Sequence, residues 1–142
     1  MIEIKNKKAY FDYTILESIE AGISLVGTEI KSIRKGSVDL KDTFITIKNN
    51  EAFILNMYIA KYEEGNIFNH DERRTRKLLL HKKEIQKLKE KVRTEGLTLI
   101  PLKLYFHKNH VKVLVGLCKG KKLYDKRASI KERDLKRETR YY

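Results

Sequence analysis

The sequence predicts a mainly β protein: a small closed or nearly closed β-barrel with two or three flanking helices and a basic C-terminal tail. About six short segments are rich in apolar and β-branched residues and are separated by turn-forming residues. A helical segment is inserted before the last hairpin, an order typical of OB-like barrels. The last apolar alternation ends at Leu117, which predicts a barrel over residues 1–118 and a tail over residues 119–142.

The first third of the chain predicts strands and one short helix. Residues 10–15 and 19–26 carry the aromatic and β-branched residues of strands, and the second of these is expected to kink at Gly22. Thr28 is suited to be the N-cap of a helix of about two turns, and Gly36 is suited to end it.

The middle of the chain predicts a hairpin followed by a surface loop. Strands over 44–48 and 52–57 are joined by Asn49-Asn50-Glu51, a composition that favours a tight turn. Residues 63–74 have no periodicity and are expected to form a surface loop. The apolar run 78–80 then predicts a buried strand or turn.

The last part predicts a helix and a second hairpin. Residues 81–93 place apolar side chains at helical spacing, and Gly96 is expected to end this helix. Strands follow over 97–106 and 111–117. In the first of them the alternation changes phase around Pro101, which predicts a bulge or an edge there.

Composition indicates a partner that carries phosphates. The 142 residues have a net charge of +13 and a pI near 9.7, which favours polyanions. Cys118 is the only cysteine, so no disulfide framework or thiolate metal site is expected. No apolar run approaches the roughly 20 residues that span a bilayer, and no signal peptide pattern opens the chain. We therefore expect a cytoplasmic protein without a membrane partner.

The tail concentrates this charge. Residues 119–142 hold ten Lys or Arg against four Asp or Glu. In a helix the cations at 126, 133, 137 and 140 would share one side, whereas Ile130 and Leu135 are too few to face a core. The tail is therefore expected to become ordered only on a polyanion. The alternative is a solvated, frayed C-terminus.

The sequence contains no evident catalytic constellation. The four histidines (70, 81, 107 and 110) show no ligand spacing, and the hairpin positions of the last two favour a surface role. Glu29, Asp39 and Asp42 could form the metal site of a nuclease. Helix N-terminal charge for Glu29 and turn chemistry for the aspartates are the favoured interpretation. We expect neither enzymatic activity nor a cofactor nor a bound metal.

A binding function is better supported. Basic residues recur beside aromatic ones: around Tyr10, Phe11 and Tyr13, around Tyr105 and Phe106, and around Tyr124. Cations neutralise phosphates while flat rings stack on exposed bases, and this combination favours structured or single-stranded RNA. Tyr124 lacks an apolar pattern that would bury it, so it is the aromatic residue most expected to contact RNA.

Five ordered motifs resemble the SmpB family of bacterial SsrA-binding (tmRNA-binding) proteins. The resemblance runs from about Asn6 to Arg133, and its motifs are residues 20–25 (Glu-Ala-Gly-Ile-Ser-Leu), 27–34 (Gly-Thr-Glu-Ile-Lys-Ser-Ile-Arg), 74–80 (Arg-Thr-Arg-Lys-Leu-Leu-Leu), 99–105 (Leu-Ile-Pro-Leu-Lys-Leu-Tyr), and 116–122 (Gly-Leu-Cys-Lys-Gly-Lys-Lys) with Asp125-Lys126-Arg127. The resemblance implies an OB-like barrel that binds the tRNA-like domain of tmRNA and brings it to stalled ribosomes in trans-translation. It further implies a tail that becomes helical in the empty mRNA channel, next to small-subunit RNA, and elongation factor Tu as a partner with alanyl-tmRNA.

The resemblance also implies site residues. The tmRNA-binding set comprises Glu20, Lys77, Leu79, Lys112, Lys119, Lys121 and Lys122. The set that serves the decoding centre comprises Tyr124, Asp125, Lys126, Arg127, Lys131, Arg133 and Arg137. Three positions depart from the family pattern: Phe11 and Tyr124 stand where many relatives have His, and Glu72 stands where many have Pro. The alternative within binding proteins is a general OB-type RNA or ribosomal protein that binds tRNAs without selectivity and needs no tail.

Overall fold

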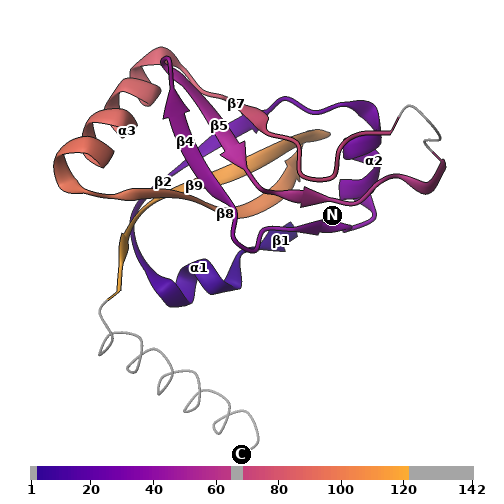
Figure 1. Ribbon diagram of the computed structural model, residues 1–142, viewed down its shortest axis with the longest axis horizontal. Helices are drawn as coiled ribbons and strands as arrows, with labels where there is room; N and C mark the ends of the chain where they lie inside the picture. The colour runs from indigo at the N-terminus through magenta and orange to yellow at the C-terminus, as the bar shows by residue number, and fades with distance from the viewer. Residues whose placement is uncertain (1–2, 65–68, 122–142) are drawn as a thin grey trace, which may run out of the picture.

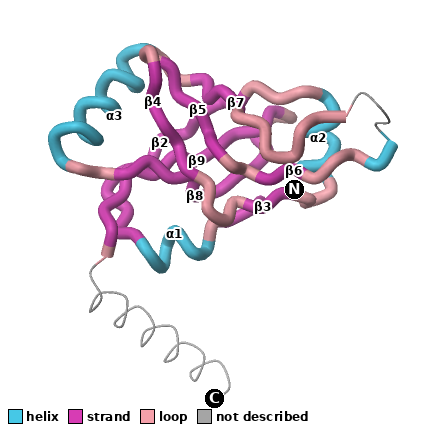
Figure 2. The backbone as a smooth tube through the Cα atoms, viewed as in Figure 1, coloured by secondary structure: helices cyan, strands magenta, loops and turns pink. Residues whose placement is uncertain are grey.

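The computed structural model describes residues 3–64 and 69–121, which form a main sheet closed on itself, a small second sheet and helices around them (Figure 1; Figure 2). Three helices and nine strands are assigned within these residues. In chain order the elements are β1 Glu3–Lys5, α1 Lys7–Asp12, β2 Tyr13–Ile23, α2 Gly27–Arg34, β3 Val38–Asp39, β4 Phe44–Lys48, β5 Glu51–Leu55, β6 Tyr58–Ile59, β7 Arg76–Leu79, α3 Lys82–Glu95, β8 Thr98–His107 and β9 His110–Gly120.

The main sheet closes because β8 pairs on both of its sides. The strand order is β1-β8-β4-β5-β7-β2-β9, and β8 pairs with β9 as well. Two strands share one edge of β8. β4 pairs with the first part of β8, where Ile45 is opposite Leu99, and β1 pairs with its last part, where Glu3 is opposite Tyr105. β3 and β6 form a separate two-stranded sheet. The mainly β barrel with flanking helices is therefore confirmed.

The barrel interior is filled by alternate residues of the strands. In β9, Val111, Val113, Val115 and Leu117 are all buried and belong to the main core. α3 and α2 lie at opposite ends of the barrel, at the left and right of Figure 1. Each contributes to the core, α3 through Leu88 and α2 through Ile33.

The predicted bulge in β8 is present and creates a second apolar cluster. The register shifts between Pro101 and Lys103, so Leu99 and Leu104 both face the barrel core although they are an odd number of residues apart. Ile100 and Leu102 lie on the other side of the sheet, where they pack with Ala9 of α1. The bulge therefore gives α1 an apolar surface on which to lie.

The N-terminal segment differs from the prediction. Residues 10–12 belong to α1 rather than to a strand, and β2 runs through Gly22 with its irregularity at Ile15–Glu17. Asn6 begins the helix: its side-chain oxygen accepts from the Ala9 N–H at 3.3 Å, and its amide donates to the Pro101 carbonyl at 2.9 Å. The hydrogen bond between Asn6 and Pro101 joins residues far apart in the chain, so local sequence periodicity does not predict it.

Both predicted helix ends are confirmed, but one predicted cap is wrong. Gly36 and Gly96 adopt positive φ angles of 76° and 65°, the left-handed conformation that favours glycine after a helix. Val26, not Thr28, is the N-cap of α2, and its N–H is satisfied by the Glu29 carboxylate at 3.0 Å. The Thr28 hydroxyl instead hydrogen-bonds to Nδ1 of His70 at 2.9 Å.

The first hairpin is tighter than predicted, and the sheet extends further. Asn49 and Asn50 alone form the turn, with φ angles of 53° and 60°, so Glu51 already belongs to β5. β9 continues through Gly120, two residues past the predicted domain boundary at 118. The Lys121 N–H then donates to the Asp12 carbonyl at 3.0 Å. Lys119 therefore belongs to the strand and not to the tail.

Gly116 is required by the close approach of Leu102. A Cβ at this position would lie 2.7 Å from Leu102 Cγ, closer than packed carbons approach. We expect Gly116→Ala to lower the free energy of unfolding by about 1–3 kcal/mol, because overpacking must displace Leu102 and α1. Urea denaturation measures this. Gly120→Ala in the same strand is the control, since a Cβ there meets nothing within 4 Å, and equal effects of both substitutions would contradict the steric explanation.

Candidate nucleic-acid interface

A transverse row of residues crosses the outer face of the barrel. Leu79 of β7 pairs with Gly22 of β2, Gly22 with Lys112 of β9, and Lys112 with Tyr105 of β8. Directly paired residues lie on the same face of a sheet. The neighbours of this row, such as Ala21, Leu78 and Val113, point into the core. We call these four residues the outer row.

The outer row is an open surface with apolar and cationic parts. Leu79 is 55% exposed. A Cβ on Gly22 would lie 3.3 Å from Leu79 Cβ, so the leucine side chain lies against the bare glycine. Lys112 is partly exposed on the other side of Gly22. A ribose or base can contact the leucine while the lysine neutralises a phosphate, a combination that suits RNA.

Glu20 lies on the same face, because it is two residues before Gly22 in β2. Its carboxylate accepts a hydrogen bond from the Tyr105 hydroxyl. Lys103 Nζ lies 5.4 Å from the centroid of the Tyr105 ring and 3.7 Å from the Glu3 carboxylate. Burial and then the hydrogen bond to Glu20 raise the pKa of Tyr105 to about 12, so this phenol remains a donor at neutral pH.

The structure brings together some of the predicted tmRNA-binding residues and separates others. Glu20, Leu79 and Lys112 surround Gly22, and Lys77 shares the outer face of β7, 3.2 Å from the Glu51 carboxylate. Lys119 is seven residues along β9 from Lys112, about 23 Å away at the usual rise of a strand. Lys121 lies beyond it, and its ammonium donates to the Tyr10 carbonyl at 3.3 Å.

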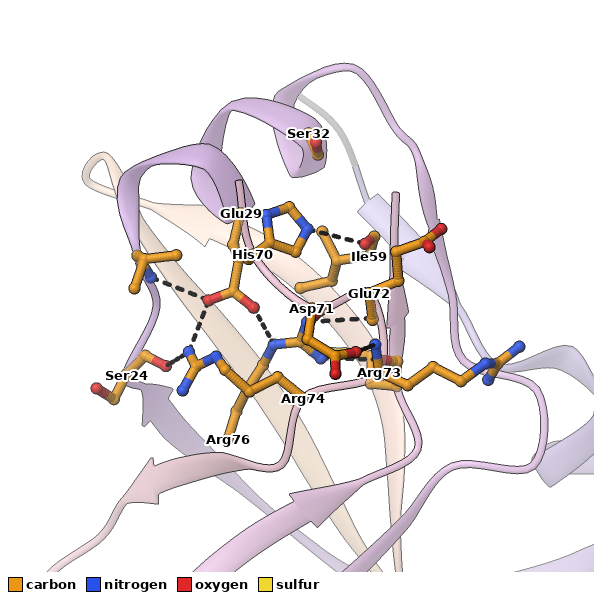
Figure 3. A network of polar contacts seen from close by, with 12 residues as sticks. Ser24, Glu29, Ser32, Ile59, His70, Asp71, Glu72, Arg73, Arg74 and Arg76 are labelled. Atoms are coloured by element: carbon orange, nitrogen blue, oxygen red, sulfur yellow. Dashed lines mark hydrogen bonds and ion pairs between the residues drawn. The ribbon is translucent and has the colours of Figure 1, made fainter. Parts of the chain in front are cut away.

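Four cations stand close together in the sequence at positions 73, 74, 76 and 77, and two of them, Arg74 and Arg76, have a structural role. Arg76 and Glu29 are fully buried, and the Arg76 Nε donates to the Glu29 carboxylate (Figure 3). Arg76 also donates to the Met57 carbonyl at 2.7 Å. Arg74 Nη2 binds the other carboxylate oxygen of Glu29 at 2.6 Å and the Ser24 carbonyl at 3.3 Å. This network holds α2, the end of β2 and the segment before β7 together.

The same network removes Glu29 from the nuclease hypothesis. Burial would raise the pKa of Glu29, but hydrogen bonds from Arg74, the Val26 N–H and Arg76 outweigh it and keep that pKa below its usual value. Asp39 accepts from the Lys41 N–H at 2.8 Å in a turn, as expected from turn chemistry. Among residues 3–64 and 69–121, no group of three or more His, Cys, Asp or Glu side chains could hold a metal ion.

His70 has a structural role that its position in a predicted surface loop does not suggest. It is buried, and its ring nitrogens contact the Thr28 hydroxyl and the Ile59 carbonyl, each at 2.9 Å. His107 and His110 are exposed at the β8–β9 turn, as expected.

The family model described as "SmpB protein" matches residues 3–141 of this chain. The chain belongs to the SmpB protein family. Curated relatives agree: the SsrA-binding protein of Carboxydothermus hydrogenoformans is 58% identical over 134 residues, which cover 94% of this chain and 90% of the relative. The SsrA-binding protein of Staphylococcus epidermidis is 59% identical, with 94% and 86% covered.

A solved SmpB structure supports the same assignment. The structure described as "tmRNA-SmpB: a journey to the center of the bacterial ribosome" superposes with a TM-score of 0.72 at 51% identity, and 85% of each chain is covered. SmpB is an RNA-binding family, which agrees with the basic composition. Within the described residues, no helix combines the length and apolar character needed to cross a bilayer.

The predicted SmpB site is only partly within the described residues. Lys122 of the tmRNA-binding set and the whole decoding-centre set (Tyr124, Asp125, Lys126, Arg127, Lys131, Arg133 and Arg137) lie outside them. Tyr105 was missing from the predicted set although it belongs to the outer row. The register of the β8–β9 hairpin could have revealed it, because a turn at His107–His110 places Tyr105 opposite Lys112.

Proposed function

We propose that this SmpB protein binds the tRNA-like domain of tmRNA and delivers it to ribosomes stalled on messages without a stop codon, in trans-translation. The observation that carries the proposal is the outer row with Glu20, which gathers residues from four strands on one open face in a member of this family. The names of the relatives and of the solved structure, which refer to SsrA-binding and to tmRNA, support the same partner.

The binding step needs no chemistry beyond charge, contact and shape. Lys112 neutralises a phosphate, and Leu79 contacts the sugar or base next to it. Gly22 has no side chain, which lets the Leu79 side chain lie against the sheet at this position. The protein acts in the cytoplasm as a binding factor and not as an enzyme, and elongation factor Tu with alanyl-tmRNA joins the complex.

The tail performs a second task in this proposal. While the barrel takes the place of the anticodon arm that tmRNA lacks, the residues after Lys121 enter the empty mRNA channel and fold along small-subunit RNA. In this segment eight Lys or Arg stand against four Asp or Glu, which supports contact with a polyanion. The tail thereby substitutes for codon–anticodon pairing at the decoding centre.

The test is a titration of the full-length protein with the tRNA-like domain against excess ordinary tRNA, at several salt concentrations. We expect selective binding that Lys112→Ala weakens, and we expect this substitution to lower the salt slope by about 0.7–0.9, as the loss of one phosphate contact should. Lys41→Ala is the control, because Lys41 is exposed in the turn that precedes β4, outside the strands that carry the outer row. A slope unchanged by Lys112→Ala would remove Lys112 from the contact surface.

The alternative is a general OB-type RNA-binding protein. It predicts equal affinity for ordinary tRNA and for the tRNA-like domain of tmRNA, which the competition arm of the titration measures. Equal affinities would overturn the proposed function.

A further inference from the structure

A carboxylate on the proposed RNA-binding face requires an explanation. Glu20 is exposed and adjoins Gly22 and Lys112, where a free carboxylate would repel phosphates. The described residues give it a definite partner, because its oxygen accepts the hydrogen bond of the Tyr105 hydroxyl. We therefore expect Glu20 to affect RNA binding through its contact with Tyr105.

The hydrogen bond fixes the direction in which Tyr105 lies. Glu20 belongs to β2 and Tyr105 to β8, and β9 runs between these two strands. Two strand spacings amount to about 9.5 Å, and side chains of a strand ordinarily stand perpendicular to the sheet. To meet, both side chains must lie across β9, so the Tyr105 ring lies along the outer face beside Lys112.

A second contact restrains the ring. Lys103 Nζ lies 5.4 Å from the Tyr105 ring centroid and is itself held 3.7 Å from the Glu3 carboxylate. The ring is thus fixed by Glu20 at its hydroxyl and by Lys103 at its face, while the residue remains partly exposed. A ring that is already ordered loses little conformational entropy when a ligand binds to it.

We infer that Tyr105 is a stacking residue for an unpaired nucleobase of the bound RNA and that Glu20 is its positioning residue. The base lies next to the phosphate that Lys112 contacts. Aromatic side chains that stack on unpaired bases are a general means of RNA recognition. This inference rests on the proposed function and specifies which chemical group of the RNA the face accepts.

Substitutions of Tyr105 test the stacking role. In titrations of the full-length protein with the tRNA-like domain of tmRNA, Tyr105→Leu should weaken binding about 5- to 150-fold, the range expected for one stacked base. The salt slope should stay at the wild-type value, because no charge is removed. Tyr105→Phe keeps the ring and should retain more affinity than Tyr105→Leu. Tyr58→Leu is the matched control, since Tyr58 also has a carboxylate partner, Glu72, and a cation, Arg73, 5.3 Å from its ring centroid.

Substitutions of Glu20 distinguish a positioning role from a purely electrostatic one, because the two roles predict changes in RNA affinity of opposite sign. Removing a carboxylate from an RNA-binding face should tighten binding if Glu20 acts only through its charge. If Glu20 positions Tyr105, Glu20→Ala should weaken binding, and Glu20→Gln should restore it, because the amide oxygen can still accept from the tyrosine hydroxyl. Thermal unfolding of each variant separates loss of fold from loss of contact.

The failures of the two proposals are distinguishable. If the wild-type protein does not prefer the tRNA-like domain over ordinary tRNA, the proposed function is wrong. If it does, but folded Tyr105→Leu binds as tightly as wild type, or Glu20→Ala tightens binding, the inference about this pair is overturned while the function stands. Should Tyr105→Leu fail to fold, Glu20→Ala and Glu20→Gln decide the question alone.

Discussion

Glu29→Gln is expected to lower the free energy of unfolding by about 3–5 kcal/mol, because it leaves the Arg76 guanidinium buried without its countercharge. Arg76 and Glu29 are both fully buried, and Arg76 has its remaining contacts with neutral carbonyls of Met57, Asp71 and Glu72. The glutamine is nearly the same shape, so the substitution changes charge and hydrogen bonding rather than packing. Urea denaturation at neutral pH measures the difference.

The matched control is a carboxylate in an exposed ion pair. Glu51 lies 3.2 Å from Lys77, and both side chains are nearly half exposed. We expect Glu51→Gln to change the free energy of unfolding by about 0–1 kcal/mol, since solvent screens such pairs. If Glu29→Gln cost no more than this control, the buried network would not be a main determinant of stability.

The same carboxylate makes stability depend on acid pH. The pKa of Glu29 is lowered from 4.5 in the folded protein, so the unfolded chain binds the proton more readily. The stabilisation is then complete above about pH 4.5 and is lost as the pH falls through the folded pKa. Over this range the wild type should lose more stability than Glu29→Gln, and parallel curves would contradict the assignment.

A chain that ends at Lys121 is expected to fold and to bind the tRNA-like domain of tmRNA but to support no peptide tagging on stalled ribosomes. The sheet is complete at Gly120, and the last described backbone contact joins Lys121 to Asp12. The removed residues include the entire set proposed for the decoding centre. Binding by titration and tagging in a reconstituted translation reaction measure the two tasks separately.

The end point of the truncation matters. A chain ending at Leu117 would also delete the β9 partners of Tyr13, Thr14 and Ile15, which are Gly120, Lys119 and Cys118. Its failure to tag would report damage to the barrel as well as loss of the tail. Tagging at the wild-type level by the chain ending at Lys121 would show that the tail is dispensable, and the proposed division of tasks would be wrong.

Local patterns in the sequence were sufficient for most of the fold. The alternation in 111–117, the glycines after both longer helices and the phase change at Pro101 each follow from backbone geometry that a few neighbouring residues determine. The predictions that were wrong concern segments whose structure depends on contacts with residues far away in the sequence. Residues 10–12 resemble a strand by composition, yet Asn6 and the apolar surface of Ile100 and Leu102 make this segment helical. The N-cap of α2 is Val26 and not Thr28, and the Val26 N–H is bound by Glu29, whose carboxylate also contacts Arg76.

The family resemblance predicted some members of the candidate site but neither Tyr105 nor the arrangement of the residues. The family resemblance supplied Glu20, Leu79 and Lys112, and the structure shows that all three surround Gly22. The sequence did not distinguish the arginines that face solvent from Arg76, because charge alone does not report burial. Nor did it connect Tyr105 with Glu20, since that contact crosses a strand between residues far apart in the chain.

The structure joins early segments of the chain to late ones, and this has a consequence for the order in which the protein can fold. Asn6 and Pro101, whose contact anchors α1, are 95 residues apart in the chain. β2 has no neighbour in the sheet before β7, and most of its length pairs only with β9. During synthesis only Gly22 and Ile23 of β2 can pair once β7 has emerged, and the rest of this first long strand remains unpaired until β9 follows. Such distant pairings make folding slow, and an unpaired strand can meanwhile associate with other chains. The nascent chain thus depends on its late strands for protection from aggregation.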